Sequence, residues 1–161
     1  MEVQTHRFGV LTVKRDEIIT FPHGILGFPD YKQYVLIEPT DSVFWFLQSV
    51  DDPDLAFVLI PPEILRPDYE ASVDKAQVAD IKLAAPENSL VFSIVTVPQN
   101  TAAMTANLQA PLVINKECGL AKQLVLMDGR YQVRHNVLEE IKAAAQKTRR
   151  QELAGTLKKS I

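Results

Sequence analysis

The sequence Thr-Ala-Asn-Leu-Gln-Ala-Pro-Leu-Val-Ile-Asn at residues 105–115 joins a polar, turn-forming segment to a short apolar run. Leu112-Val113-Ile114 reads as a buried strand. Pro111 suits the first residue of that strand or a sheet edge, because proline has no N–H to donate to the ladder. Asn107 and Asn115 can bond nearby backbone groups and so compete with regular structure. The stretch predicts a recognition surface on a rigid sheet, and it contains no nucleophile, acid–base pair or metal ligand set.

Strand signals dominate the chain before residue 135. Runs rich in β-branched and aromatic residues occur at 3–8, 10–13, 18–21, 34–38, 44–48, 56–60, 90–97, 112–114, 123–127 and 131–134. Gly9 predicts a tight hairpin between the first two runs. Asp128-Gly129 predicts another between the last two, because this dipeptide favours the turns that join antiparallel strands.

Helical signals are few. Apolar residues at helical spacing predict a short helix over 74–83. A longer helix begins near Asn136, a good N-cap residue, and we expect Gly155 to end it. The sequence thus predicts a mainly β fold: a compact, antiparallel, β-barrel-like single domain with a short mid-chain helix and a C-terminal helix. Residues 1–135 would form the barrel-like part, and residues 136–161 a helix and basic tail packed on it or extending from it.

Charge is distributed unevenly along the 161 residues. Residues 1–133 carry ten basic and seventeen acidic side chains, whereas residues 134–161 carry seven basic and three acidic ones. An acidic body argues against non-specific nucleic-acid binding, which needs Lys and Arg to neutralise phosphates. It favours a basic protein partner, because opposite fields speed encounter and fix orientation.

Composition points to the cytoplasm. The start of the chain lacks the pattern of a signal peptide, and the apolar runs are far shorter than the ~20 residues that span a bilayer. Cys118 is the only cysteine, and we expect it to be a buried or half-buried thiol. We find no histidine cluster, no phosphate loop and no calcium loop, so we expect no catalytic residue, cofactor or metal site.

The segment Phe21-Pro22-His23-Gly24-Ile25-Leu26-Gly27-Phe28-Pro29 combines turn formers with apolar side chains. One interpretation is a packed corner leaving the first sheet. The other is a loop whose backbone and apolar side chains meet a partner, and a corner can do both.

The run Val43-Phe44-Trp45-Phe46-Leu47-Gln48-Ser49 is a dense aromatic strand. Alternation places aromatic side chains on both faces, which predicts a central strand or one with a covered outer face. An exposed platform for single-stranded nucleic acid is the alternative, but such platforms need a basic groove. Asp41, Asp51, Asp52 and Asp54 flank this strand instead.

These motifs together resemble the FliW family of bacterial flagellar assembly factors. The resemblance rests on residues 21–28, on Phe46-Leu47-Gln48-Ser49, on Val95-Thr96-Val97 and above all on residues 105–115. Tyr131 and Arg134 also fit. Order and spacing agree from about residue 8 to residue 138, and the basic tail lies outside the pattern.

The resemblance implies a non-enzymatic, cytoplasmic binding protein with a compact β-barrel-like fold. It implies two mutually exclusive protein partners, flagellin and the translational repressor CsrA, and relief of CsrA repression of flagellin synthesis. It implies no direct contact with nucleic acid or membrane, and we expect a monomer when the protein is free.

The segments 24–28 and 100–109 are our hypothesis for part of the shared surface. We take the partner-binding candidates to be Phe21, Gly24, Leu26, Gly27, Phe28, Gln48, Ser49, Asn100, Asn107, Leu108, Pro111 and Asn115. For Asn107 and Asn115 a purely structural role in a barrel corner is the competing interpretation. The rival functions are a single-stranded nucleic-acid-binding barrel and a small cofactor-binding barrel enzyme.

Overall fold

The computed structural model describes residues 1–160, with side chains described to residue 155. Its strands are β1 (Glu2–Thr5), β2 (Gly9–Thr12), β3 (Ile18–Thr20), β4 (Gln33–Ile37), β5 (Trp45–Ser49), β6 (Ala56–Ile60), β7 (Ser89–Thr96), β8 (Thr105–Ala106), β9 (Leu112–Asn115), β10 (Ala121–Gln123) and β11 (His135–Asn136). The α-helices are α1 (Pro62–Leu65) and α2 (Val137–Ser160). Short 3-10 helices are η1 (Arg15–Glu17), η2 (Lys75–Ile81), η3 (Pro86–Asn88) and η4 (Thr101–Ala103). The predicted mainly β fold, with a short mid-chain helix and a C-terminal helix, is confirmed.

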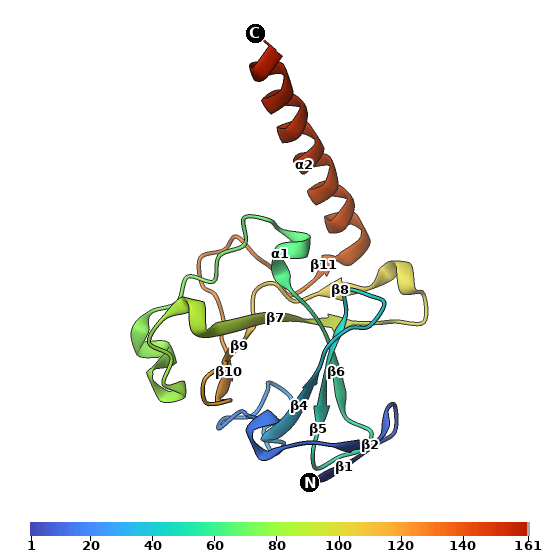
Figure 1. Cartoon of the computed structure of the whole chain (residues 1–161), viewed down its shortest axis with the longest axis vertical. Helices are drawn as coiled ribbons and strands as arrows, with labels where there is room; N and C mark the ends of the chain where they lie inside the picture. Colours follow the sequence, from blue (N-terminus) through green and yellow to red (C-terminus); the bar gives the residue numbers. More distant parts are fainter. Residues whose placement is uncertain (161) are drawn as a thin grey trace.

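One antiparallel sheet forms most of the body, with strand order β10-β9-β7-β6-β5-β4-β3. The two ends of this sheet meet at a bridge between Thr20 and Leu120, where the N–H of Thr20 donates to the carbonyl of Gly119 at 2.8 Å. The sheet therefore curls until its edges touch, which gives the barrel-like form. The β1–β2 hairpin packs beside it (Figure 1), and Gly9 turns it with φ of 69° as predicted.

β7 pairs with two strands along one of its edges. Its first half pairs with β9 and its end pairs with β8, so the chain between β8 and β9 must turn a corner over residues 107–111. This corner lies within residues 105–115, the motif on which the family resemblance mainly rests. β11 completes the region by pairing with β8.

The aromatic strand β5 lies between β4 and β6. Leu47, Gln48 and Ser49 are fully buried, while Trp45 packs against Phe92 with ring centroids 5.0 Å apart. The ring of Phe46 lies 5.3 Å from that of Phe8, edge-on. Both faces of β5 are therefore covered, as the alternation predicted.

The C-terminal helix begins where the sequence predicted. The side chain of Asn136 accepts from the N–H of Glu139 at 2.9 Å, which caps α2. The prediction that Gly155 ends this helix is wrong, because α2 continues through it. Glycine costs only about 1 kcal/mol relative to alanine inside a helix, and no proline follows to stop the chain. α2 packs on α1 at its base and projects from the body on the side away from the N-terminus (Figure 1).

The predicted strands at 123–127 and 131–134, with their Asp128-Gly129 hairpin, are wrong. The chain after β10 stays extended, and the N–H groups of Leu124 and Leu126 donate to the carbonyls of Pro111 and Gln109. Pro111 has no N–H that could donate back to the carbonyl of Leu124, so a regular ladder of hydrogen bonds cannot continue. The Asp128 side chain binds the backbone N–H and guanidinium of Arg130, which makes a local turn.

The short helix predicted over 74–83 is confirmed as the 3-10 helix η2, which ends at Lys82 in the left-handed conformation with φ of 58°. One further prediction needs correction. Cys118 is exposed rather than buried or half-buried, because it stands in the turn that follows the buried strand β9.

Candidate protein-binding groove

A surface groove joins the two segments that the sequence singled out. Leu26 and Phe28 line it from the loop after β3, and Asn107 lines it from the corner between β8 and β9. Val97, just after β7, and Val133, before β11, add exposed apolar side chains, and apolar residues of β6 and β7 line the rest. We call this surface the Leu26–Asn107 groove. It is assembled from seven separate parts of the chain, so its existence depends on the fold.

Four large apolar side chains are exposed in this groove. The exposed fractions are 69% for Leu26, 55% for Val133, 47% for Val97 and 36% for Phe28. Single exposed apolar residues are common, but a group of them on one hollowed surface marks an interaction site. The groove is therefore the strongest candidate for protein recognition in the described part of the chain.

The loop that carries Leu26 and Phe28 is held rigidly. Gly24 has φ of 69°, and a Cβ atom there would lie 2.7 Å from the Cα of Pro29, so only glycine fits without a shift. The N–H of Phe28 donates to the carbonyl of Ile25 at 2.7 Å. The ring of Phe28 packs edge-on against Phe57 at 5.2 Å.

Gln123 connects this loop to the sheet. Its Oε1 accepts from the N–H of Leu26 at 2.9 Å, and its Nε2 donates to the carbonyl of Ala110 at 3.1 Å. One side chain thus links the loop after β3 to the 107–111 corner. The two halves of the groove are therefore held in a fixed relation.

Asn107 serves the backbone of its own corner. Its Oδ1 accepts from the N–H groups of Gln109 and Ala110 at 3.1 and 2.9 Å, and its own N–H donates to the carbonyl of Ile94. Asn107 lines the groove, and its Nδ2 donates no hydrogen bond to the backbone of residues 1–160 or to the side chains described to residue 155. Asn107 therefore has a structural role and still offers a donor to a partner.

The twelve candidate residues divide by exposure. Leu26, Gly27, Phe28 and Asn100 are exposed, and Asn107 is half-buried. The other candidates are buried and cannot touch a partner directly in this structure: Phe21, Gly24, Gln48, Ser49, Leu108, Pro111 and Asn115. For these seven, contact with a partner stays a prediction, and their burial gives them a positioning role in this structure.

Gln48 and Ser49 show what such positioning does. The Nε2 of Gln48 donates to the carbonyls of Asp52 and Leu55 at 3.2 and 3.1 Å, and the hydroxyl of Ser49 accepts from the N–H groups of Asp51 and Asp52. The turn between β5 and β6 is therefore held from inside. Asp51 and Asp54 are exposed, whereas Asp52 is half-buried and its Oδ1 accepts from the backbone N–H of Asp54 at 2.9 Å. We call residues 51–54 the acidic turn.

Arg7 and Val133 were not among the residues predicted from the sequence, and Val97 and Arg134 were quoted there only as part of the family resemblance. Both arginines line the groove and are exposed. The guanidinium of Arg7 lies 4.9 Å from the centre of the Phe46 ring, a distance typical of a cation–π contact. Isolated residues with unremarkable neighbours carry no local signal, so only the fold could reveal them.

Ionic contacts next to the loop fix it further. His23 binds Asp80 through Nε2 at 3.0 Å, and Lys122 binds the same carboxylate at 3.2 Å. The hydrogen bond from His23, together with Lys122, lowers the pKa of Asp80 below its ordinary value. The start of the 24–28 loop is thus connected to η2.

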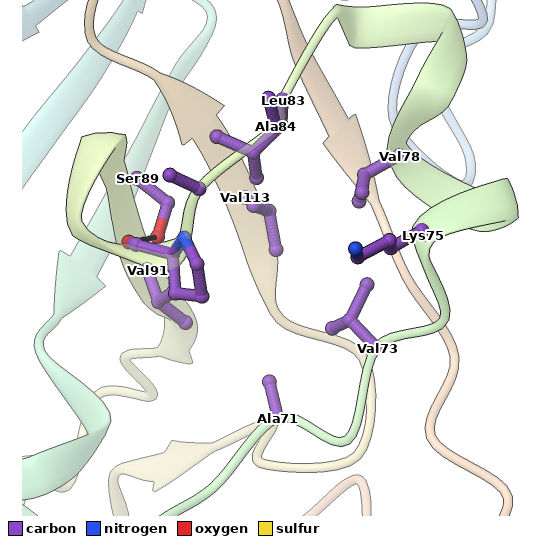
Figure 2. A pocket seen from close by; sticks show the side chains of 11 residues that line it. Ala71, Val73, Lys75, Val78, Leu83, Ala84, Ser89, Val91 and Val113 are labelled. Atoms are coloured by element: carbon purple, nitrogen blue, oxygen red, sulfur yellow. Dashed lines mark hydrogen bonds between the residues drawn. The ribbon is translucent and has the colours of Figure 1, made fainter.

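A second hollow lies between the η2–η3 arm and the strands β7 and β9 (Figure 2). Its lining is mostly apolar and includes Val78, Leu83, Val91 and Val113. Lys75 extends toward it, and the hydroxyl of Ser89 donates to the carbonyl of Pro86 at 2.6 Å. None of the candidate residues lines this hollow, so we do not take it as the protein-binding site.

Among the described residues, no group of three or more His, Cys, Asp and Glu side chains is arranged to hold a metal ion. In the same part of the chain, no helix has the length and apolar character needed to cross a membrane.

Known proteins resemble this chain over most of its length. A family model described as FliW protein matches residues 2–137. The flagellar assembly factor FliW of Treponema denticola is 39% identical over 144 residues, covering 89% of this chain and 98% of that protein. The protein of the same name from Heliobacterium modesticaldum is 46% identical over 140 residues, covering 85% and 90%.

A solved structure agrees with the sequence comparison. The crystal structure of the flagellar assembly factor FliW superimposes with a TM-score of 0.79 at 34% identity, covering 85% of this chain and 96% of that one. The family match ends at the first residue of α2, so that helix lies beyond it.

Proposed function

This chain belongs to the FliW family, and from that premise we propose that it binds two proteins, flagellin and the translational repressor CsrA. Binding flagellin would protect the subunit before export. Binding CsrA would relieve repression of flagellin synthesis. Both partners meet such a factor in the cytoplasm, where we place this protein as a free monomer.

The observation that supports this proposal most is the Leu26–Asn107 groove. Its exposed apolar side chains and rigid walls suit an amphipathic segment that lays its apolar face into a hydrophobic groove. Because the 24–28 loop is held by Gly24, Gln123 and Phe57, the groove is already formed before a partner arrives. Preformed sites lose less conformational entropy on binding.

The acidic turn supports the second partner. A repressor that binds RNA must present basic groups, since phosphate contacts are made by Lys and Arg. Asp51 and Asp54 are exposed at the end of the sheet, where they can attract such a surface. If the two partners exclude each other, accumulated flagellin withdraws this protein from CsrA by mass action alone.

The alternative of a single-stranded nucleic-acid-binding barrel is less well supported. Such binding stacks bases on exposed aromatic rings, whereas the aromatic strand β5 is covered on both faces. No observation in the described residues favours a cofactor-binding enzyme, so we do not propose one.

The proposal is tested with Leu26→Asp, which places a charge in the apolar groove at a solvent-exposed position. We expect its affinity for purified flagellin, measured by isothermal titration calorimetry, to fall at least about tenfold, as for an apolar anchor at an interface. Val10→Asp is the matched control, because Val10 is exposed on the β1–β2 hairpin and does not line the groove. Unchanged flagellin binding by a folded Leu26→Asp protein would refute a role for the groove.

A further inference from the structure

We infer that the Leu26–Asn107 groove selects an apolar segment flanked by carboxylates, and that the acidic turn beside it takes the basic partner. This inference rests on the proposed function and assigns each partner to a surface. It follows from the charges that surround the groove.

Two arginines are the only charged residues in the groove lining. Arg7 and Arg134 come from opposite ends of the sequence, and no Asp or Glu lines the groove with them. Neither guanidinium pairs with a carboxylate among the side chains described to residue 155. On a body with seven more acidic than basic side chains in residues 1–133, this surface therefore has the opposite local sign.

Arg7 is held in place before any partner binds. Its guanidinium lies over the ring of Phe46, and Phe46 is itself packed edge-on by Phe8. A cation fixed over an aromatic face still directs its N–H groups to solvent. Arginine presents these donors in a planar fork that matches a carboxylate, so a carboxylate-bearing segment would satisfy it.

The acidic turn adjoins the groove at Arg7. A small cleft lined by His6, Arg7, Pro53 and Asp54 leads from the turn, and it shares Arg7 and Ala56 with the groove. His6, which precedes Arg7, is bound to the acidic turn, because its Nδ1 contacts Oδ1 of Asp54 at 2.6 Å and its backbone N–H donates to the carbonyl of Pro53 at 2.9 Å. Two partners that occupy these neighbouring surfaces would therefore overlap at Arg7, which explains mutual exclusion without a change of shape.

The first experiment reverses the groove charges with Arg7→Glu and Arg134→Glu in one protein. We expect the affinity for purified flagellin to fall about tenfold or more at low salt, because like charges at an interface oppose binding. The loss should shrink in high salt, which screens exposed charges. Arg15→Glu is the control, since Arg15 is exposed in η1 and does not line the groove. Circular dichroism and thermal melting verify that each variant is folded.

The second experiment reverses the acidic turn with Asp51→Lys and Asp54→Lys. We expect the affinity for purified CsrA to fall about tenfold or more by the same argument, while flagellin binding is retained. The arginine reversal should leave CsrA binding unchanged or stronger. The assignment is supported if the arginine reversal weakens only flagellin binding and the aspartate reversal weakens only CsrA binding.

The outcomes separate the two proposals. One outcome is that Leu26→Asp weakens flagellin binding while the arginine reversal does not. The groove then binds flagellin, but its charges do not select the segment. In that case the present inference is overturned and the proposed function stands. If the wild-type protein binds neither purified flagellin nor purified CsrA, the proposed function itself fails. If it binds both and none of these variants changes either affinity, the partners bind elsewhere and only the assignment of surfaces is overturned. If the arginine reversal instead changes the mass of the free protein in light scattering, the groove binds a second copy of the chain, and the assignment is again overturned.

Discussion

Asn115 is almost fully buried, and its amide is used completely by neighbouring backbone. Its Nδ2 donates to the carbonyls of Ile81 and Lys82 at 3.0 and 3.1 Å, while its Oδ1 accepts from the N–H of Glu117. These bonds hold the left-handed turn at Lys82 against the end of β9. The structural interpretation of this asparagine, one of the two considered from sequence, accounts for all its described contacts.

Replacing Asn115 by Ala tests this role. The change leaves two carbonyls without their donor at a buried site, so we expect a loss of about 2 kcal/mol in the free energy of unfolding. Urea denaturation followed by circular dichroism measures it. Asn100→Ala is the control, because Asn100 is exposed and makes a single cap bond to Ala102. An Asn115→Ala protein as stable as the control would contradict the assignment.

The base of α2 is the element that fixes the helix to the body. Arg66, just after α1, binds Glu140 with Nε–Oε2 and Nη2–Oε1 distances of 2.6 and 3.0 Å. His135 in β11 lies 3.2 Å from the same carboxylate and accepts from the N–H of Gln132 through Nε2. An imidazole that accepts at Nε2 carries its proton on Nδ1, which therefore donates to Glu140. The carboxylate of Glu140 in α2 thus binds His135 from β11 and Arg66 from just after α1.

Glu140→Gln should change how stability depends on pH. The hydrogen bond from Arg66 is the main cause that lowers the pKa of Glu140 below its ordinary value of 4.5. A lowered carboxyl pKa stabilises the fold at pH values above that ordinary value, and the stabilisation is lost as pH falls through the pKa of the folded state. We expect the wild type to exceed the variant by about 2 kcal/mol at pH 7 and the difference to vanish in acid.

Urea unfolding at pH 7, 5 and 3 measures this difference. Glu139→Gln provides the matched control, because Glu139 precedes Glu140 on α2 but is exposed and does not bind Arg66. A stability difference between wild type and Glu140→Gln that stays constant across the three pH values would show that the ion pair does not cause it.

At the scale of the whole molecule, closure of the sheet depends on a short contact between β3 and the turn before β10. Gly119 has φ of 73°, and a Cβ atom there would lie 2.7 Å from the carbonyl oxygen of Ile18. The backbone at this position must approach β3 closely for Thr20 to bond Gly119. The barrel-like form therefore requires glycine where the two edges meet.

Gly119→Ala should weaken this closure. The left-handed conformation alone costs roughly 1–2 kcal/mol for a residue with a Cβ, and the contact with Ile18 adds to it. We expect faster hydrogen exchange at the Thr20 amide than at the amides of β5, and a lower unfolding midpoint. Gly129→Ala isolates the conformational cost, because Gly129 has φ of 78° with no atom within 4 Å of a Cβ. Equal effects of the two substitutions would show that closure does not depend on Gly119.

Features that depend on neighbours along the chain could be predicted from the amino-acid sequence. Alternation in residues 45–49 predicted a strand covered on both faces, Asn136 predicted a helix start, and the 105–115 motif predicted the family. The same local reasoning failed where a distant group decided the outcome. Residues 123–127 have the pattern of a strand, but the missing N–H of Pro111, across the sheet, prevents a regular ladder.

Which residues share a surface became visible only in the folded chain. Arg7, Leu26, Phe28, Asn107 and Arg134 carry no common pattern in the sequence, yet the closed sheet brings them to one groove. Burial likewise gives Gln48 and Asn115 a supporting role in turns, while their contact with a partner stays a prediction. The physical reason is that periodicity and turn chemistry report backbone geometry within a few residues, whereas a binding surface is made by strand pairing between residues far apart in the chain.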